Sequence, residues 1–263
     1  METIHLSPVD LSIASGLVLA LAVVTGWLGL AVSRRVIIAA IRTTIQLSLV
    51  GIVLKALFAA SNPLWMALVA CVMLAVAAYE VRARQKRRFR GGWSFGIGGV
   101  SMFLSSFAVT VLMLLTVVQP TPWYEPRYAI PLLGMMTGNT MTGIALGLNQ
   151  LSNTAFDARA TIEAQLTLGS SGAESIHDIR NDAIRTGLIP MLNSMAAAGV
   201  VSLPGMMTGQ ILAGNAPGEA VRYQILIMFM IAAGTGFGVM AAVFIGARRL
   251  FDERDRLRLD RLK

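Results

Sequence analysis

Charged residues are scarce in this chain, and their scarcity excludes an ordinary soluble domain. Asp, Glu, Lys and Arg make up 14% of the 263 residues, whereas hydrophobic residues make up 55%. Soluble domains carry about 25% charged residues. The mean hydropathy is +0.66, and several apolar runs exceed the ~20 residues needed to cross a bilayer. The sequence therefore predicts an integral membrane protein.

Residues and motifs that support common chemistry are also few. The single cysteine, Cys71, can form no internal disulfide and lies in an apolar run, which favours a packing role. The sequence contains no GxxxxGK[ST] and no HExxH, so it has no familiar phosphate loop and no familiar zinc site. We expect no cofactor in this chain and no enzymatic activity of its own.

Seven apolar segments predict one all-α membrane domain covering residues 1–263. They are 9–32, 36–60, 64–81, 93–118, 128–151, 186–213 and 219–247. The sixth segment contains Pro190 and Pro204, and Leu203-Pro204-Gly205 is expected to break a regular helix.

Lys and Arg concentrate in alternate connections between these segments. The basic connections are 34–35, 82–90 and 159–185, together with the tail 248–263. Because cytoplasmic loops are enriched in Lys and Arg, we expect the N-terminus outside and the C-terminus in the cytoplasm of an inner or plasma membrane. This pattern accounts for the net charge of +8 without nucleic acid. The 82–90 run either anchors the topology or binds anionic membrane lipid.

The longest polar segment between the apolar runs covers about residues 155–185. Apolar residues recur in it every three or four positions, which predicts amphipathic helices on the cytoplasmic side. Gly169 is expected to end the first helix, and Ser170 or Ser171 to cap a second one with Glu174 one turn in. We interpret this segment as a docking element for a soluble partner.

No Asp or Glu lies deep inside a predicted span, which argues against a proton-driven mechanism. The deepest charge is Arg42, with Gln46 on the same helical face. Arg42 either faces a polar interior, as a functional residue, or extends to the headgroups or a carboxylate such as Glu80. A passive path remains open on these residues, as does transport driven by another subunit. A scaffold without transport is the third possibility.

Five methionines cluster around two copies of Gly-Met-Met-Thr-Gly, at 134–138 and 205–209. They are Met135, Met136, Met141, Met206 and Met207, with Asn139 adding an oxygen. Thioether sulfur suits Cu(I). The alternative is packing, since Met fills irregular apolar space and Gly-x-x-x-Gly is a helix-contact spacing. The same spacing occurs at Gly143 with Gly147 and at Gly234 with Gly238.

Several segments resemble the FetB-like family of ABC-transporter permeases. They are 42–55, 131–139, 168–169, 179–180, 185–190, 201–209 and 223–224, and the resemblance covers about residues 34–245. Bacterial members are associated with iron export and with metal or oxidative stress resistance, and plant relatives with aluminium tolerance. The resemblance implies a permease homodimer that exports iron or another metal. Two copies of a separate cytoplasmic ATPase would bind the ATP and Mg.

The resemblance also implies roles for individual residues. Glu163-Ala164 followed by Gly169 is similar to the Glu-Ala-Ala…Gly loop that docks importer permeases onto their ATPases, with Gln165 in place of the second alanine. The implied coupling residues are Glu163, Ala164, Leu168, Gly169, Ser170 and Ser171. The candidates for the translocation path are Arg42, Gln46, Met135, Met136, Asn139, Met141, Pro204, Met206 and Met207. An ATP-independent channel for metal ions or small solutes is the competing function.

Overall fold

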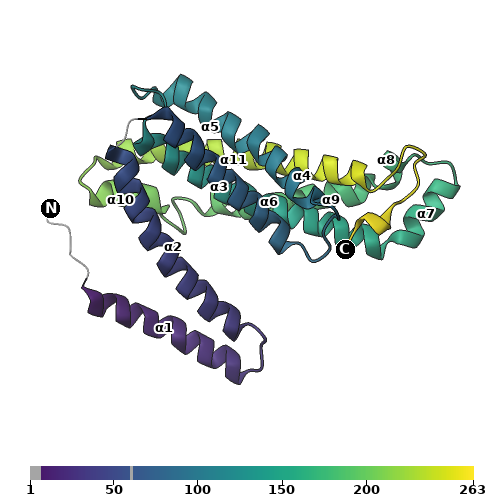
Figure 1. Ribbon diagram of the computed structural model, residues 1–263, viewed down its shortest axis with the longest axis horizontal. Helices are drawn as coiled ribbons and strands as arrows, with labels where there is room; N and C mark the ends of the chain where they lie inside the picture. Colours follow the sequence, from purple (N-terminus) through teal and green to yellow (C-terminus); the bar gives the residue numbers. More distant parts are fainter. Residues whose placement is uncertain (1–6, 60–61) are drawn as a thin grey trace. The chain divides into compact units, whose positions relative to one another are not determined.

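The computed structural model describes residues 7–59 and 62–263, and these residues form helices without any strand (Figure 1). They divide into two compact units. The smaller unit consists of the residues up to Ser61 together with Leu212–Gly214. The larger unit consists of Asn62–Ile211 and Asn215–Lys263.

The smaller unit contains the helices α1 (Pro8–Trp27) and α2 (Ser33–Ala59). Ser7 caps α1, because its hydroxyl accepts a hydrogen bond from the N–H of Asp10 at 3.3 Å. Most side chains of both helices are exposed and apolar, as expected for surfaces that face lipid. The first predicted span, 9–32, ends five residues early at Trp27. The predicted end of the second span, Ala60, lies outside the described residues.

In the larger unit, α3 (Pro63–Arg84) is followed by a helical rod from Trp93 to Val118. The rod contains α4 (Trp93–Met102), a π-helical turn at Phe103–Phe107, α5 (Ala108–Met113) and a second π-helical turn at Leu114–Val118.

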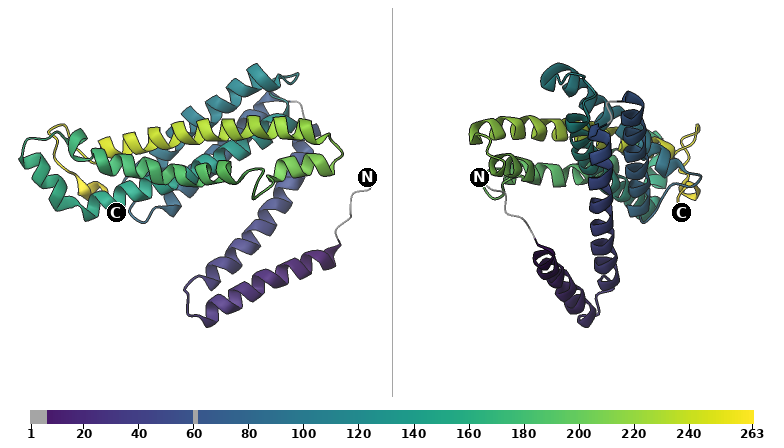
Figure 2. Two further views of the ribbon diagram at one scale, coloured as in Figure 1. Left: turned by 180° about the vertical axis from the view of Figure 1, so that it is seen from behind. Right: turned by 60° about the vertical axis from the view of Figure 1, so that its left-hand side comes forward.

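Three further helices pack on one another in the larger unit: α6 (Pro126–Asp157), α9 (His177–Ala197) and α11 (Pro217–Arg249) (Figure 2). Helix α6 has 32 residues, hence a length of about 48 Å at 1.5 Å per residue. The hydrocarbon core of a bilayer is about 30 Å thick. Helix α6 is therefore longer than a membrane requires.

Five described helical segments are long and apolar enough to cross a membrane. They are Val9–Trp27, Ser33–Lys55, Pro63–Arg84, Trp93–Val118 and Pro217–Arg249. The expected all-α polytopic fold is confirmed. The fifth predicted span, 128–151, lies within the continuous helix α6, whose threonines and asparagines make it more polar. The span count of seven stays a prediction.

The sixth predicted span is not one helix. Helix α9 ends at Ala197, residues 198–204 are not helical, and α10 runs from Gly205 to Leu212. Gly199 has a φ of +81°, which a glycine adopts without strain. Pro204 directly precedes α10, where its missing N–H costs no helical hydrogen bond. The break expected at Leu203-Pro204-Gly205 is therefore present, and it extends back to residue 198.

Glycines hold α6, α9 and α11 close together. A Cβ built on Gly187 would lie 2.7 Å from Val239 Cγ1 and 2.8 Å from the main-chain oxygen of Gly143, so a side chain fits at neither glycine without a shift. Close contacts also surround Gly147, Gly234 and Gly238. The predicted contact role of these two Gly-x-x-x-Gly pairs is confirmed.

The two repeated pentapeptides behave differently. Beyond their own helices, no described atom lies within 4 Å of a Cβ built on Gly138, Gly205 or Gly209, while Gly134 meets Met73 Cε at 3.4 Å. Among the described residues of a single chain, the helix packing expected from the pentapeptides is thus present at Gly134 alone, and the other three glycines have no such neighbour. Their small-residue surfaces remain open.

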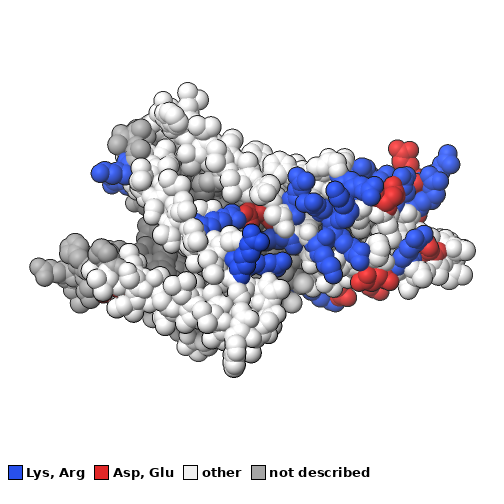
Figure 3. Space-filling model, turned by 60° about the horizontal axis from the view of Figure 1, so that its bottom comes forward, with Lys and Arg blue, Asp and Glu red and all other residues white. Residues whose placement is uncertain are grey.

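The basic C-terminal segment 250–263 folds back instead of extending as a tail. Leu262 pairs with Phe89, and both side chains are buried. We call the part of the larger unit formed by residues 85–92, 155–180 and 250–263 the basic end. Figure 3 shows Lys and Arg gathered over this end, with fewer Asp and Glu among them.

Candidate coupling site and translocation path

The polar segment after α6 forms α7 (Arg159–Thr167), α8 (Gly172–Ser175) and the start of α9. Its apolar residues turn inward: Ile162 and Ile176 are buried in the main core of the larger unit. The predicted amphipathic character is confirmed. The second amphipathic stretch, however, continues through Ile176 into α9, so it is joined to a long helix.

The turn between α7 and α8 is fixed by local hydrogen bonds. Gly169 has a φ of +95°, and its N–H donates to the oxygen of Leu166 at 3.1 Å. The hydroxyl of Ser171 accepts from the N–H of Glu174 at 3.3 Å, and the N–H of Ser171 donates to Glu174 Oε2 at 2.8 Å. Both expected caps are present, and the second one is Ser171.

The capping box also acts on the Glu174 carboxyl. Hydrogen bonds from the main chain and then the hydroxyl of Ser171 lower the pKa of Glu174 below its ordinary value. The carboxylate therefore stays charged, which suits its place in the first turn of a helix.

The residues proposed for coupling lie along the exposed side of this turn. Leu168 is 86% exposed at its tip. Glu163 and Ala164 are exposed on the preceding helix, and Glu163 accepts a hydrogen bond from Arg159 Nε at 2.8 Å. The turn therefore exposes a leucine beyond the core on a backbone that local hydrogen bonds fix.

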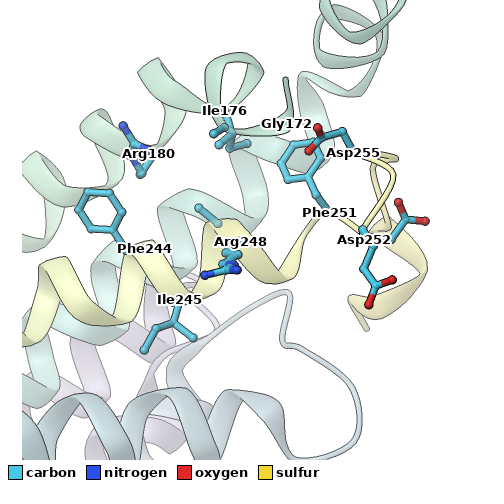
Figure 4. Close-up of a pocket in the computed structure, with 12 residues that line it drawn as sticks. Gly172, Ile176, Arg180, Phe244, Ile245, Arg248, Phe251, Asp252 and Asp255 are labelled. Carbon is cyan, nitrogen blue, oxygen red and sulfur yellow. The ribbon is translucent and has the colours of Figure 1, made fainter. Parts of the chain in front are cut away.

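Beneath α8 lies a groove of about 690 Å³ between α8–α9 and the end of α11 (Figure 4). The guanidinium of Arg180 lies over the ring of Phe244, 4.7 Å from its centroid. Phe251 and Asp255 of the C-terminal segment reach Gly172, where a Cβ would lie 2.7 Å from each. The expectation of a basic tail at 248–263 did not predict this groove, which forms because residues 250–263 fold back.

Asp252 organises the segment that forms one wall of this groove. Its carboxylate accepts from the N–H groups of Arg254 and Arg256, each at 3.0 Å, and pairs with the Arg256 guanidinium at 2.8 Å. These bonds, the main-chain bond from Arg256 first, lower the pKa of Asp252 to about 2.

The methionines proposed for the path divide between separate places. Met135, Met136 and Met206 join one apolar cluster, whereas Met141 packs against the main core. The exposed side chain of Asn139 donates from Nδ2 to the oxygen of Met135 at 2.8 Å. The structure thus brings three of the five methionines together.

Met207 and Pro204 line a different depression, of about 490 Å³, beside the break between α9 and α10. Met195, Met228 and Gln224 share its wall. Gln224 is 8% exposed, and its Oε1 has no hydrogen-bond partner within the described parts of the chain. Gln224 was missed among the sequence candidates, although a glutamine in the apolar run of α11 was the available signal.

Arg42 and Gln46 lie on α2 in the smaller unit, where both are exposed. Across residues 7–59 and 62–263, no group of three His, Cys, Asp or Glu side chains is placed to hold a metal ion.

Comparison with known proteins now decides the family. Residues 8–251 match the Uncharacterised protein family (UPF0014). The chain belongs to this family. The UPF0014 membrane protein slr1647 of Synechocystis is 37% identical over 257 residues, 97% of each chain. No solved structure matches the chain.

Two relatives in the UPF0014 family carry more informative names. The probable iron export permease protein FetB of Escherichia coli is 32% identical over 230 residues, 84% of this chain and 83% of that protein. Protein ALUMINUM SENSITIVE 3 of Arabidopsis thaliana is 33% identical over 195 residues, 74% and 69% of the two chains. The resemblance seen in the sequence is confirmed at the level of the family, whose members are integral membrane proteins.

Proposed function

We propose that this chain is the membrane subunit of an ABC transporter that exports iron or another metal. A separate cytoplasmic subunit would bind Mg and hydrolyse the ATP. The single observation that carries the proposal is the turn between α7 and α8. It presents Leu168 at 86% exposure on a backbone fixed by Gly169 and Ser171. The name of the relative FetB, a probable iron export permease, supports the choice of substrate.

Movement of the docked turn has to be transmitted to the membrane helices. Helix α8 leads through the buried Ile176 directly into α9. Helix α9 in turn touches α6 where Gly187 meets Gly143. Closure of an ATPase dimer against the turn would therefore tilt α9 against α6, and the break at 198–204 would let the far end move separately.

For the path itself, we favour the depression beside this break. Its support is Gln224, whose buried Oε1 is free to accept a donor or contact a cation. Thioethers from Met195, Met207 and Met228 line the same space. The second cluster, with Met135, Met136 and Met206, would form the adjoining wall.

A homodimer fits the open pentapeptide surfaces. Outside their own helices, a Cβ on Gly138, Gly205 or Gly209 would have no described atom within 4 Å, and small residues of this kind allow helices of two chains to approach. In this arrangement the two copies would present two docking turns to two ATPase subunits, with the N-termini outside and the C-termini in the cytoplasm.

The docking role is tested by comparing Leu168→Ser with Val201→Ser. We call the turn between α7 and α8, residues 168–171, the docking turn. Val201 is 83% exposed and lies in the break between α9 and α10, away from the docking turn. We expect Leu168→Ser to weaken binding of the native ATPase by about 10- to 30-fold, as for a central interface residue. Val201→Ser should bind like the wild type. Equal binding by all three chains would contradict the docking site.

Transport is tested with inside-out vesicles that contain the permease and its ATPase. We expect Fe²⁺ uptake that requires ATP and that Gly169→Trp abolishes, because tryptophan is strained at a φ of +95°. The Gly169→Trp chain should still insert into the membrane. Fe²⁺ flux without ATP would instead establish the competing function, an ATP-independent channel.

A further inference from the structure

A second cavity at the basic end, of about 430 Å³, is lined almost entirely by cations and glycines. We call it the basic pocket, and it is lined by Arg82, Arg88, Phe89, Arg90, Gly91, Gly92 and Lys263. Its four cations come from three parts of the chain: the last turn of α3, the connection 85–92 and the C-terminal segment. None of the lining side chains is acidic.

Main-chain hydrogen bonds hold these cations together. The N–H of Arg88 donates to the oxygen of Lys263 at 3.0 Å, and the N–H of Lys263 donates back at 2.8 Å. The N–H of Arg90 donates to the oxygen of Arg261 at 2.8 Å. The basic residues are therefore brought together by the backbone, against their mutual repulsion.

Side chains below the pocket complete its support. Phe89 and Leu262 are buried. Ser94 Oγ accepts from the N–H of Phe89 at 2.7 Å and donates to Gln85 Oε1 at 3.0 Å. These contacts beneath the pocket involve no charged side chain.

Neighbouring arginines have acidic partners, but the pocket cations do not. Arg84 pairs with Glu80 at 3.8 Å, and Arg87 pairs with Asp157 at 3.9 Å. Within the described chain, none of the four pocket cations forms an ion pair with a carboxylate. A preformed site with four unpaired cations fits a ligand that carries negative charge.

The position of the pocket selects a membrane ligand. It lies where α3 ends at Arg84 and α4 begins at Trp93, and both belong to segments apolar enough to span a membrane. Trp93 is 46% exposed, and the Arg249 guanidinium lies 4.2 Å from its ring centroid. Tryptophan at a helix end is typical of the headgroup level. We propose that the basic pocket binds the phosphate of an anionic phospholipid headgroup.

This site has a structural consequence beyond charge neutralisation. Lys263 closes the pocket, and the same C-terminal segment reaches Gly172 of α8 through Phe251. A bound headgroup would offset the repulsion between Lys263 and the pocket arginines. It would therefore stabilise the folded-back segment 250–263 next to the docking turn. A ligand that binds only the folded state raises its stability.

The test uses the full chain in detergent, titrated with phosphatidylglycerol and, separately, phosphatidylcholine. Binding is measured by native mass spectrometry and by the thermal unfolding midpoint. We expect phosphatidylglycerol alone to bind and to raise the midpoint. The pair Arg88→Gln and Arg90→Gln should weaken its binding by about 30-fold, since each basic residue near an anionic lipid surface contributes about a factor of five.

The matched control removes two other exposed cations of this unit, with Arg185→Gln and Arg254→Gln. This control pair should change the affinity for phosphatidylglycerol by less than about threefold, because salt screens exposed charges that lie away from the bound headgroup. An equal loss in control and pocket variants would overturn a defined site. The unfolding midpoint of each variant without lipid shows whether that variant is folded. The charge-conserving pair Arg88→Lys and Arg90→Lys should bind phosphatidylglycerol more tightly than the Gln pair does. If millimolar inorganic phosphate reproduces the stabilisation and displaces the lipid, the site belongs to free phosphate and the lipid assignment is wrong.

Discussion

The contact between Gly143 of α6 and Gly187 of α9 provides a quantitative test of the packing. A Cβ on Gly143 would lie 2.8 Å from Val239 Cγ2 and 2.9 Å from the oxygen of Gly187. The second neighbour is main chain, so the helices must separate to admit Gly143→Ala. Such overpacking costs about 1–3 kcal/mol, and we expect about 2–3 kcal/mol because the main chain cannot rotate away.

The control is Gly236→Ala on α11, where no described atom outside its own helix lies within 4 Å of the added Cβ. Both variants gain about 1 kcal/mol of helix propensity, so their difference isolates the clash. At about 2–4 °C per kcal/mol for a chain of this size, Gly143→Ala should unfold about 4–12 °C below Gly236→Ala. Tryptophan fluorescence during heating in detergent measures the difference.

The same reasoning predicts that Gly143→Ala and Gly187→Ala are not additive. Each new methyl group would face the other glycine's main-chain oxygen, so one helix separation relieves both clashes. The double variant should therefore lose clearly less than the sum of the single losses. Equal unfolding midpoints for Gly143→Ala and Gly236→Ala would refute the close approach.

Three other predictions concern the basic end and the path. Because the pKa of Asp252 is lowered to about 2 from 3.8, its stabilisation of residues 250–263 is complete above about pH 4 and is lost as the pH falls toward 2. Hydrogen exchange there should be faster in Asp252→Asn at pH 7, and unchanged exchange would contradict this. Ser171→Ala should cost about 1 kcal/mol of local stability, seen as about fivefold faster exchange at residues 172–175, with Ser170→Ala as the control. Gln224→Met should leave the unfolding midpoint unchanged or higher, because a buried unsatisfied oxygen is removed, while Fe²⁺ transport falls at least tenfold. Normal transport would exclude Gln224 from the path.

Much of the local structure was predictable because it depends on neighbours in the chain. The apolar runs became helices, and Gly169 and Ser171 formed the caps that their spacing indicates. The proline before Gly205 predicted the interruption of the sixth segment. These features rest on interactions within about four residues, which a sequence pattern records directly.

The candidate path was less predictable because it depends on which helices meet. Five methionines in or near the repeated pentapeptides have different surroundings: Met136 lies beside Gly234, Met141 packs against the main core, and Met207 lines the same depression as Gln224. Pattern alone assigns them equal roles, since each is an apolar residue in a helix. Their surroundings in the folded chain, such as the contact of Met136 with Gly234 of α11, distinguish them.

The sequence by itself therefore determined that the chain lies in a membrane as helices, where the turn between α7 and α8 begins and ends, and where one segment breaks. Hydrophobic transfer and local capping are properties of single segments. Only the tertiary structure decided that Lys263 returns to Arg88, that Gly187 faces Gly143, and that Gln224 is buried without a partner. Each of these features depends on close packing between segments that are distant in the sequence. A glycine without a side chain, or one pair of main-chain hydrogen bonds, sets how closely two such segments approach.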